Sequence, residues 1–395
     1  MNFCKPKYIL LSTLILIFTG CQSGPKNNAP QTNPDIQRAP IEMKSIPASA
    51  SQTLLPGAQQ STTRVAMILP LTGTHARLGT SMLNAAQLSL FEHAPDHLEL
   101  ISEDSEGTPE GAVRAAQKAI QNGAAIILGP IFSQEAQAVA AVSGPVPVLS
   151  FSNNRDIASA NLFVLGFMPD QQIQRLFESA RAKGITKIAI LASSNEAGKT
   201  MSAQAEQVAR SVGVELISIP SYASGSYDMQ AQAKSILQNK VQAVLIPEGG
   251  QPLRLMVSSL ISHGINPHHV KFMGSGQWDN PSVFADKNLV GAWFASSSSS
   301  LRQGFNKKYV NTYGQPAPRL ATLAYDSISM LSYLAKTKDP AQAFSLSSLL
   351  ESRGFEGVDG IFKFNGDGTV IRGLVVYEIT ETNELKEISP APQVF

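Results

Sequence analysis

The sequence predicts an α/β protein with two doubly wound parallel-sheet lobes, followed by a C-terminal β-hairpin. Two observations lead to this fold class. Apolar runs of strand length alternate with helical patterns along nearly the whole region after residue 63. The runs are continuous rather than alternating, which is typical of strands that are covered on both faces. The first run, Val65–Leu69, ends at Pro70, and a polar loop separates it from a helix that begins near Gly79.

The first lobe begins with five predicted strands and three helices. The helix near residue 108 has a clear start, because Thr108 can cap it and Pro109 fits its first turn. The predicted strands are 64–69, 97–102, 124–128, 146–149 and 162–165, and the helices are 79–90, 108–121 and 133–142.

The same alternation begins again after residue 168, which predicts a second lobe of the same class. Its predicted strands are 187–192, 214–219, 243–246, 270–273 and 291–295. Its predicted helices are 169–183, one that follows the first strand and ends at about residue 212, 228–238 and 252–263. Three more helices are predicted at 301–313, 319–335 and 345–352. The turn Asn365-Gly366-Asp367-Gly368, between residues 360–364 and 369–379, predicts a β-hairpin.

The first 63 residues predict export and a tether rather than a fold. Lys5 and Lys7 precede the apolar run 8–18, which is too short for a bilayer but typical of a signal peptide, here residues 1–20. Residues 18–21 resemble a bacterial lipobox, which implies lipidation of Cys21 and anchoring to a membrane. An ordinary signal peptide with an incidental cysteine is the alternative. The sorting rule of such lipoproteins implies the periplasmic side of the outer membrane, because Gln22 follows the cysteine. Residues 21–63 are rich in Pro, Ser, Asn and Gln, which predicts a lipidated, disordered tether.

The composition excludes several classes of function. A net charge of +1 gives no electrostatic basis for binding nucleic acid. Both cysteines, Cys4 and Cys21, precede the globular region, so a disulfide framework or a cysteine metal site is not expected there. The stretch 193–200 ends in Gly-Lys-Thr but has Ser193 where a phosphate loop needs glycine, and no GxSxG motif occurs. We therefore predict a protein that is not an enzyme and has no cofactor or metal.

Polar residues that follow predicted strands are the candidate ligand-binding residues, since open α/β sheets bind ligands at the carboxyl ends of their strands. Caps of helices and turns are the alternative role for the same side chains. The first lobe supplies Ser133, Ser150, Ser152, Asn153 and Asn154, and the second supplies Asn195, Glu248 and Gln277.

Three short motifs make residues 64–380 resemble type I periplasmic-binding proteins, especially the group that binds branched-chain amino acids. They are Leu71-Thr72-Gly73 with Gly79, Asp104 with Thr108-Pro109-Glu110, and Gly129-Pro130 with Ser133. The resemblance implies three crossings between the lobes, near Met168, Ser297 and Glu351. It thereby assigns 64–168 and 297–350 to lobe 1, 169–296 and 351–380 to lobe 2, and 381–395 to a tail.

The resemblance also implies a binding site for a small polar ligand, in which Ser152 and Asn154 hold a carboxylate. Two departures argue against a standard amino-acid site. Leu78 stands where the family has an aromatic residue against the ligand, and residues 274–277 contain no acid to pair with an ammonium. Glu248 is the possible substitute.

Two functions remain from the sequence. The favoured one is a lipoprotein that activates penicillin-binding proteins, because a long tether and outer-membrane sorting suit a protein that reaches a peptidoglycan synthase. The alternative is the solute-binding protein of an ABC transporter for amino acids or related ligands.

Overall fold

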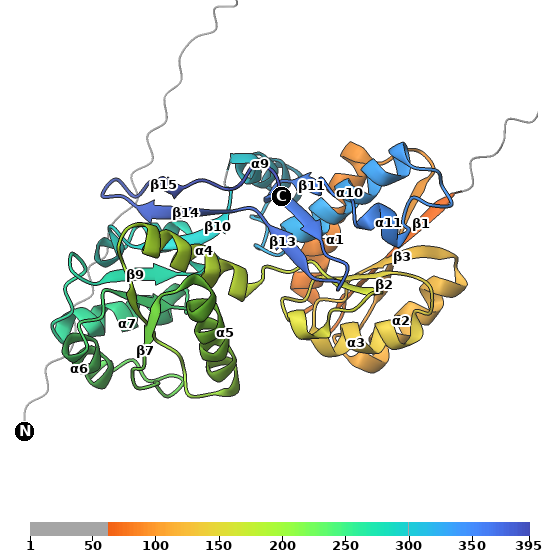
Figure 1. The fold of residues 1–395 in the computed structure, drawn as a ribbon. Coiled ribbons are helices and arrows are strands. Elements are labelled where there is room, and N and C mark those ends of the chain that lie inside the picture. Colours follow the sequence, from red (N-terminus) through yellow and green to blue (C-terminus); the bar gives the residue numbers. More distant parts are fainter. Residues whose placement is uncertain (1–61, 299) are drawn as a thin grey trace, which may run out of the picture. The chain divides into compact units, whose positions relative to one another are not determined.

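The computed structural model describes residues 62–298 and 300–395 (Figure 1). The predicted signal peptide, the lipidation site Cys21 and the tether up to residue 61 lie outside the described residues. Thr63, predicted to end the tether, is the first residue of strand β1. Within residues 62–298 and 300–395, every helix is too short or too polar to cross a bilayer.

The first sheet is parallel, with five strands in the order β2-β1-β3-β4-β5. Val65–Leu69 are fully buried, as expected for a strand covered on both faces. The strands are β1 (Thr63–Leu69), β2 (Leu98–Asp104), β3 (Ala124–Leu128), β4 (Val148–Ser150) and β5 (Leu162–Val164). The connecting helices are α1 (Ala76–His93), α2 (Pro109–Gln121) and α3 (Ser133–Val142), and a short 3₁₀ turn η1 (Arg155–Ile157) follows β4.

The second sheet has seven strands in the order β15-β14-β10-β9-β8-β6-β7. Its β6–β10 part is parallel, whereas β14 and β15 add antiparallel strands at one side. The strands are β6 (Lys187–Ile190), β7 (Glu215–Ile217), β8 (Ala243–Ile246), β9 (Lys271–Gly274), β10 (Trp293–Ser297), β14 (Leu374–Ile379) and β15 (Leu385–Ser389). The helices between them are α4 (Pro169–Ala182), α5 (Glu196–Val212), α6 (Gln230–Gln238), α7 (Gly250–Ser262) and α8 (Pro281–Phe284), with 3₁₀ turns η2 (Gly276–Trp278) and η3 (Lys287–Leu289).

Alternate residues of one strand show that both faces of the second sheet are buried. Ile188 and Ile190 pack in one core with Phe177, whereas Ala189 and Leu191 pack in another with Trp278. Period-two alternation into two cores is what a sheet with helices on both faces requires. The predicted α/β class with parallel sheets is therefore confirmed.

The remaining elements pack mainly with the first sheet. They are α9 (Ser300–Tyr313), α10 (Ala321–Thr337), α11 (Leu346–Leu349) and a three-stranded antiparallel sheet of β11 (Phe355–Gly357), β12 (Gly360–Phe364) and β13 (Val370–Arg372). Helix α10 lies along α1, and Phe355, Phe362 and Phe364 belong to the core of the first sheet.

The predicted hairpin turn is present, since the amide of Asn365 donates to the carbonyl oxygen of Thr369. Its second arm stops at Arg372, and β14 then pairs with β10 of the second sheet. Because the phenylalanines before this point pack in the first core, we propose that the last crossing lies at Gly373 rather than near Glu351. Residues 385–389, predicted as part of a tail, form β15.

Candidate functional site

A cavity of about 530 Å³ lies where strands of both sheets end. Its wall takes Phe151 from the end of β4, Ser275 from the end of β9, and Ser297 from the last position of β10. The size falls within the range of small-molecule sites, and the carboxyl ends of parallel strands are the usual place for them.

Apolar side chains cover much of the cavity wall. Phe132, Phe151 and Phe167 come from loops after three strands of the first sheet, and Met201 and Leu320 add aliphatic surface. Nine polar residues also line the cavity, so the wall offers hydrogen-bonding groups beside its apolar surface. They are Asn153, Gln172, Ser275, Gln277, Asp279, Asn280, Ser296, Ser297 and Arg319.

Of the five polar residues predicted on the first sheet, Asn153 lines the cavity. The hydroxyl of Ser150 donates to the carbonyl oxygen of Pro130 at 2.8 Å and accepts from the amide of Ser152 at 3.1 Å. Ser152 accepts in turn from the amide of Asn154 at 3.1 Å, and Asn154 caps η1. Ser133 is the first residue of α3. Their role in binding a ligand stays a prediction, and the bonds shown shape the loop that carries Asn153 and Phe151.

Of the three residues predicted on the second sheet, Gln277 lines the cavity. Asn195 caps α5 by accepting from the amide of Gly198 at 2.9 Å. Glu248 accepts a hydrogen bond from the hydroxyl of Tyr222, and burial together with this bond raises the pKa of Tyr222. Glu248 is therefore engaged with Tyr222, and the acid at the cavity wall is Asp279, which the sequence reasoning missed.

Arg319 lines the cavity and is held in place by four neighbours. Its side chain is 28% exposed and donates to the carboxylate of Asp359 at 2.8 Å, to Ser297 at 2.6 Å and to Thr322 at 2.8 Å. The guanidinium lies over the ring of Phe167, 4.0 Å from its centroid. These described partners use three of the five N–H groups of the guanidinium, and Arg319 lines the cavity, so we expect it to be the cationic group that meets a ligand there.

A second arginine, Arg302, forms an ion pair with Asp279 at the cavity wall. Arg302 of α9 bonds to Asp279 and lies 3.3 Å from Asp359, and Ser296 also donates to Asp279 at 2.7 Å. Both side chains of the Arg302–Asp279 pair are only 8% exposed. Among the described residues of the wall, the one carboxylate is thus already paired, and a ligand ammonium would be buried without a free partner, which costs several kcal/mol.

The pKa values of two buried aspartates in this network are shifted in opposite directions. Burial opposes ionisation of Asp359, but Arg319 and Arg302 outweigh it and hold the pKa of this carboxyl well below its usual range. Burial and the neighbouring charge of Asp359 raise the pKa of Asp326 to about 7, although it accepts from the amide of Val358 at 2.7 Å. Asp359 is thus the charged member at neutral pH, and Asp326 is partly protonated.

This arrangement predicts a pH-dependent stability that Asp326→Asn removes. The folded chain keeps the Asp326 proton up to pH about 7, whereas the unfolded chain loses it near pH 4. The folded state therefore binds more protons in this window, and stability falls as pH rises through it. Urea unfolding at pH 5 and at pH 8 measures this effect. From pH 5 to pH 8, the free energy of unfolding of the wild type should decrease by about 1–3 kcal/mol more than that of Asp326→Asn. Equal losses in the two proteins would contradict the assignment.

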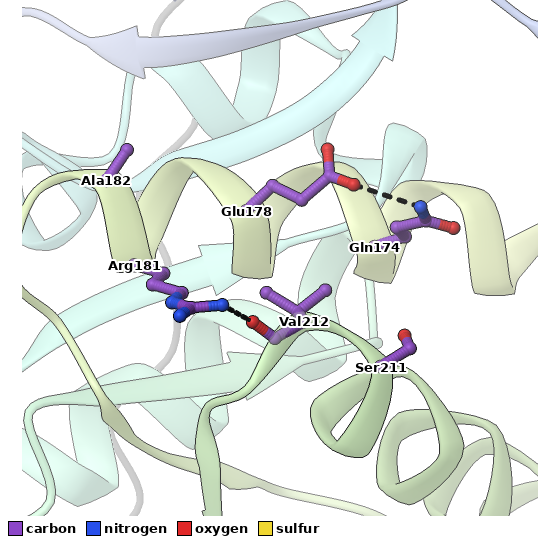
Figure 2. A pocket seen from close by; sticks show the side chains of 6 residues that line it. All are labelled: Gln174, Glu178, Arg181, Ala182, Ser211 and Val212. Atoms are coloured by element: carbon purple, nitrogen blue, oxygen red, sulfur yellow. Dashed lines mark hydrogen bonds between the residues drawn. The ribbon is translucent and has the colours of Figure 1, made fainter.

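A second hollow, of about 540 Å³, lies between α4 and α5 and is shown in Figure 2. Gln174 donates to Glu178 at 2.9 Å, and Arg181 donates to the carbonyl oxygen of Val212. All six lining residues come from the two helices, and Ser211 donates to the carbonyl oxygen of Val208 within α5, so the polar side chains of this hollow already have partners on these helices. Chemistry and position therefore favour the cavity at the strand ends as the functional site.

The part of the chain that the structure describes contains no group of three or more His, Cys, Asp or Glu side chains that could hold a metal ion. What remains is a parallel α/β protein with a ligand-sized, mostly apolar cavity at the strand ends of two sheets. These features define the class of small-ligand binding proteins.

Residues 62–384 match the family of periplasmic binding proteins, and the chain belongs to this family. The family indicates a periplasmic location. A search of curated proteins finds no match to the chain.

Solved structures of type I periplasmic binding proteins share the fold. A protein of Rhodospirillum rubrum, described as a candidate branched-chain amino acid ABC transporter, has a TM-score of 0.73 and 17% identity, over 83% of this chain and 100% of that one. The branched-chain amino acid transporter substrate binding protein of Streptococcus pneumoniae, in complex with isoleucine, has a TM-score of 0.61 and 18% identity, over 84% and 100%. A solute binding protein of an R. palustris ABC transporter, in complex with benzoate, has a TM-score of 0.60 and 18% identity, over 84% and 98%. At these identities the likeness shows the fold alone.

Proposed function

We propose that this chain is the solute-binding protein of an ABC importer, and that its ligand is a small apolar or aromatic carboxylate without an ammonium group. The single observation that carries the proposal is the pairing of charges at the cavity wall. Asp279 is paired with Arg302, whereas Arg319 lines the cavity and has two N–H groups that its described partners do not use. The rings of Phe132, Phe151 and Phe167 provide apolar surface for the rest of the ligand.

The structural neighbours support a transport role, since two of those described above are substrate-binding proteins of ABC transporters solved in complex with isoleucine or benzoate. Activation of penicillin-binding proteins, which the sequence favoured, rests on the lipid anchor and tether, and both lie outside the described residues. Activation of penicillin-binding proteins is therefore the second candidate function. Anchoring of the chain in the outer membrane through Cys21 remains part of that proposal.

A comparison of matched ligands tests the proposal. Leucine and 4-methyl-2-oxopentanoate share the same side chain and carboxylate, and only leucine carries an ammonium. We expect the oxo acid and benzoate to raise the melting temperature by several degrees at saturation, and leucine to do so much less, because a bound ligand stabilises the folded state by mass action. A larger shift with leucine would reject the ligand class. No shift with any member of a broad solute panel, together with crosslinking to a bifunctional peptidoglycan synthase, would favour the activator.

Phe132 offers a charge test inside the cavity. It occupies the N-cap position of α3 and makes no side-chain capping bond, so asparagine or aspartate there should cap the helix and preserve the fold. Phe132→Asn removes apolar wall and is expected to weaken carboxylate binding about tenfold. Phe132→Asp adds a negative charge and should weaken it by a further factor of ten or more, about 1.4 kcal/mol. Equal affinities of the two variants in calorimetry would show that the ligand carboxylate lies elsewhere.

A further inference from the structure

The chain passes between the two sheets at three places that lie close together. Arg372, at the end of β13, donates to the carbonyl oxygen of Leu165 at 2.7 Å, and its guanidinium lies 5.1 Å from the ring centroid of Phe167. Arg319 contacts the same ring and bonds to Ser297. The residues before α4, after β10 and before β14 therefore form one hinge region.

Residues 390–395 run from the second sheet across this region. Arg175 of α4 donates to the carbonyl oxygen of Pro390 at 2.5 Å, to Ser389 at 2.7 Å and to the carbonyl oxygen of Leu374 at 2.9 Å. Further along, the carbonyl oxygen of Pro392 comes within 3.4 Å of where a side chain on Gly373 would begin.

The far end of the segment reaches the first core. The ring of Phe395 lies 5.3 Å from the ammonium of Lys363 on β12, and Phe362 and Phe364 beside it belong to the core of the first sheet. Residues 390–395 therefore connect the second sheet with a strand that packs on the first.

Residues 390–395 are absent from the lining of the cavity and instead line a separate hollow behind β13. Successive side chains of a strand point to opposite faces. The guanidinium of Arg372 on β13 contacts Phe167, which lines the cavity, whereas the neighbouring Ile371 lines the separate hollow, which has a volume of about 420 Å³. Pro390, Pro392, Val394 and Phe395 line this separate hollow too. Arg372 also reaches it and Leu374 lines both spaces, so Arg372 and Leu374 lie between the two.

We propose that residues 390–395 act as a strap that resists closure of the cavity between the two sheets. When two bodies close around a hinge, groups on the open side approach and groups on the opposite side separate. Separation would break the contacts of Arg175 with Pro390 or of Lys363 with Phe395, so the strap stabilises the open form. This proposal rests on the proposed function, because it concerns regulation of the same cavity.

The test measures, in the absence of ligand, the distance between labels placed on elements of the two sheets. The described residues from 62 to 395 belong to one compact unit, and residues 58–395 contain no native cysteine. Gln117→Cys on α2 and Gln238→Cys on α6 therefore provide a unique pair of exposed labelling sites. We expect deletion of residues 391–395 to raise the short-distance population between the labels three- to tenfold. Lys363→Met, which removes the charge over Phe395 but keeps the aliphatic stem, should give a smaller change in the same direction.

Val394→Ser is the matched control, because this side chain is 80% exposed and its replacement leaves both end contacts in place. It should leave the distance distribution unchanged, and thermal unfolding should show that all variants are folded. An unchanged distribution after the deletion, or a shift to longer distances, would overturn the strap. Since no ligand is present, such a result is distinct from a ligand panel without any thermal shift, which would instead reject the proposed function.

Discussion

Asp359→Ala is expected to lower the free energy of unfolding by about 3–5 kcal/mol, which is a large part of the stability of an ordinary domain. The carboxylate of Asp359 is fully buried and lies between the guanidinium groups of Arg302 and Arg319, and the hydroxyl of Ser297 also donates to it at 2.9 Å. Its removal leaves two positive charges with less compensation in a low-dielectric region. Urea unfolding of residues 58–395 at pH 7 measures the loss.

The surface pair of Arg114 and Glu106 provides the control for this prediction. Its nitrogen–oxygen distance is 2.9 Å, but the two side chains are 60% and 52% exposed. Glu106→Ala should therefore cost no more than about 1 kcal/mol, because solvent screens exposed ion pairs. Similar losses for the two variants would mean that the Asp359 network contributes little beyond an ordinary surface pair.

Asp359 also affects the cavity, because Arg319 is shared between the two. Without the carboxylate, Arg319 would keep Ser297, Thr322 and the ring of Phe167 as neighbours, but it would lose its charged partner. A carboxylate ligand could then replace part of the lost pairing. We therefore expect ligand to stabilise Asp359→Ala at least as much as the wild type, although the variant without ligand is much less stable.

The order of strands and helices could be predicted from the sequence because local patterns determine it. The predicted bounds of 124–128 and 133–142 are those of β3 and α3, since a continuous apolar run and a helix with alanine-rich periodicity can each be identified in isolation. Strand β15 was missed for the opposite reason. It is five residues long, carries Lys386 and Glu387, and lies at the edge of its sheet, where no continuous apolar run is needed.

The cavity was harder to predict, because its chemistry depends on partners far apart in the chain. Asp359 follows Arg319 by forty residues, and nothing near either residue indicates the pair. The search for polar residues after strand ends found Asn153 and Gln277. The same rule applied to aromatic residues would have identified Phe132, Phe151 and Phe167. Ser150 and Asn195, by contrast, accept hydrogen bonds from nearby backbone amides. A polar residue after a strand can always have this structural role instead of binding a ligand.

Trp278→Ala should cost about 3–5 kcal/mol and also weaken ligand binding. The indole is fully buried in the core of the second sheet, and its Nε1–H donates to the carbonyl oxygen of Glu248 at 2.8 Å. Its ring packs so closely on Gly274 that a Cβ there would lie 2.0 Å from it. The tryptophan thus fixes the turn at Ser275–Gln277, which forms part of the cavity wall.

Two further variants separate packing from hydrogen bonding at this position. Trp278→Phe keeps most of the ring volume but removes the N–H donor, so an intermediate loss of about 1–2 kcal/mol is expected. Phe91→Ala, at a side chain that is 91% exposed, should change stability by no more than about 0.5 kcal/mol. The decisive measurement is ligand affinity at a temperature where every variant is folded. Trp278→Ala could be destabilised and still bind ligand as tightly as Phe91→Ala does. That result would show that the turn at Ser275–Gln277 keeps its position without the indole, and that ligand affinity does not depend on Trp278.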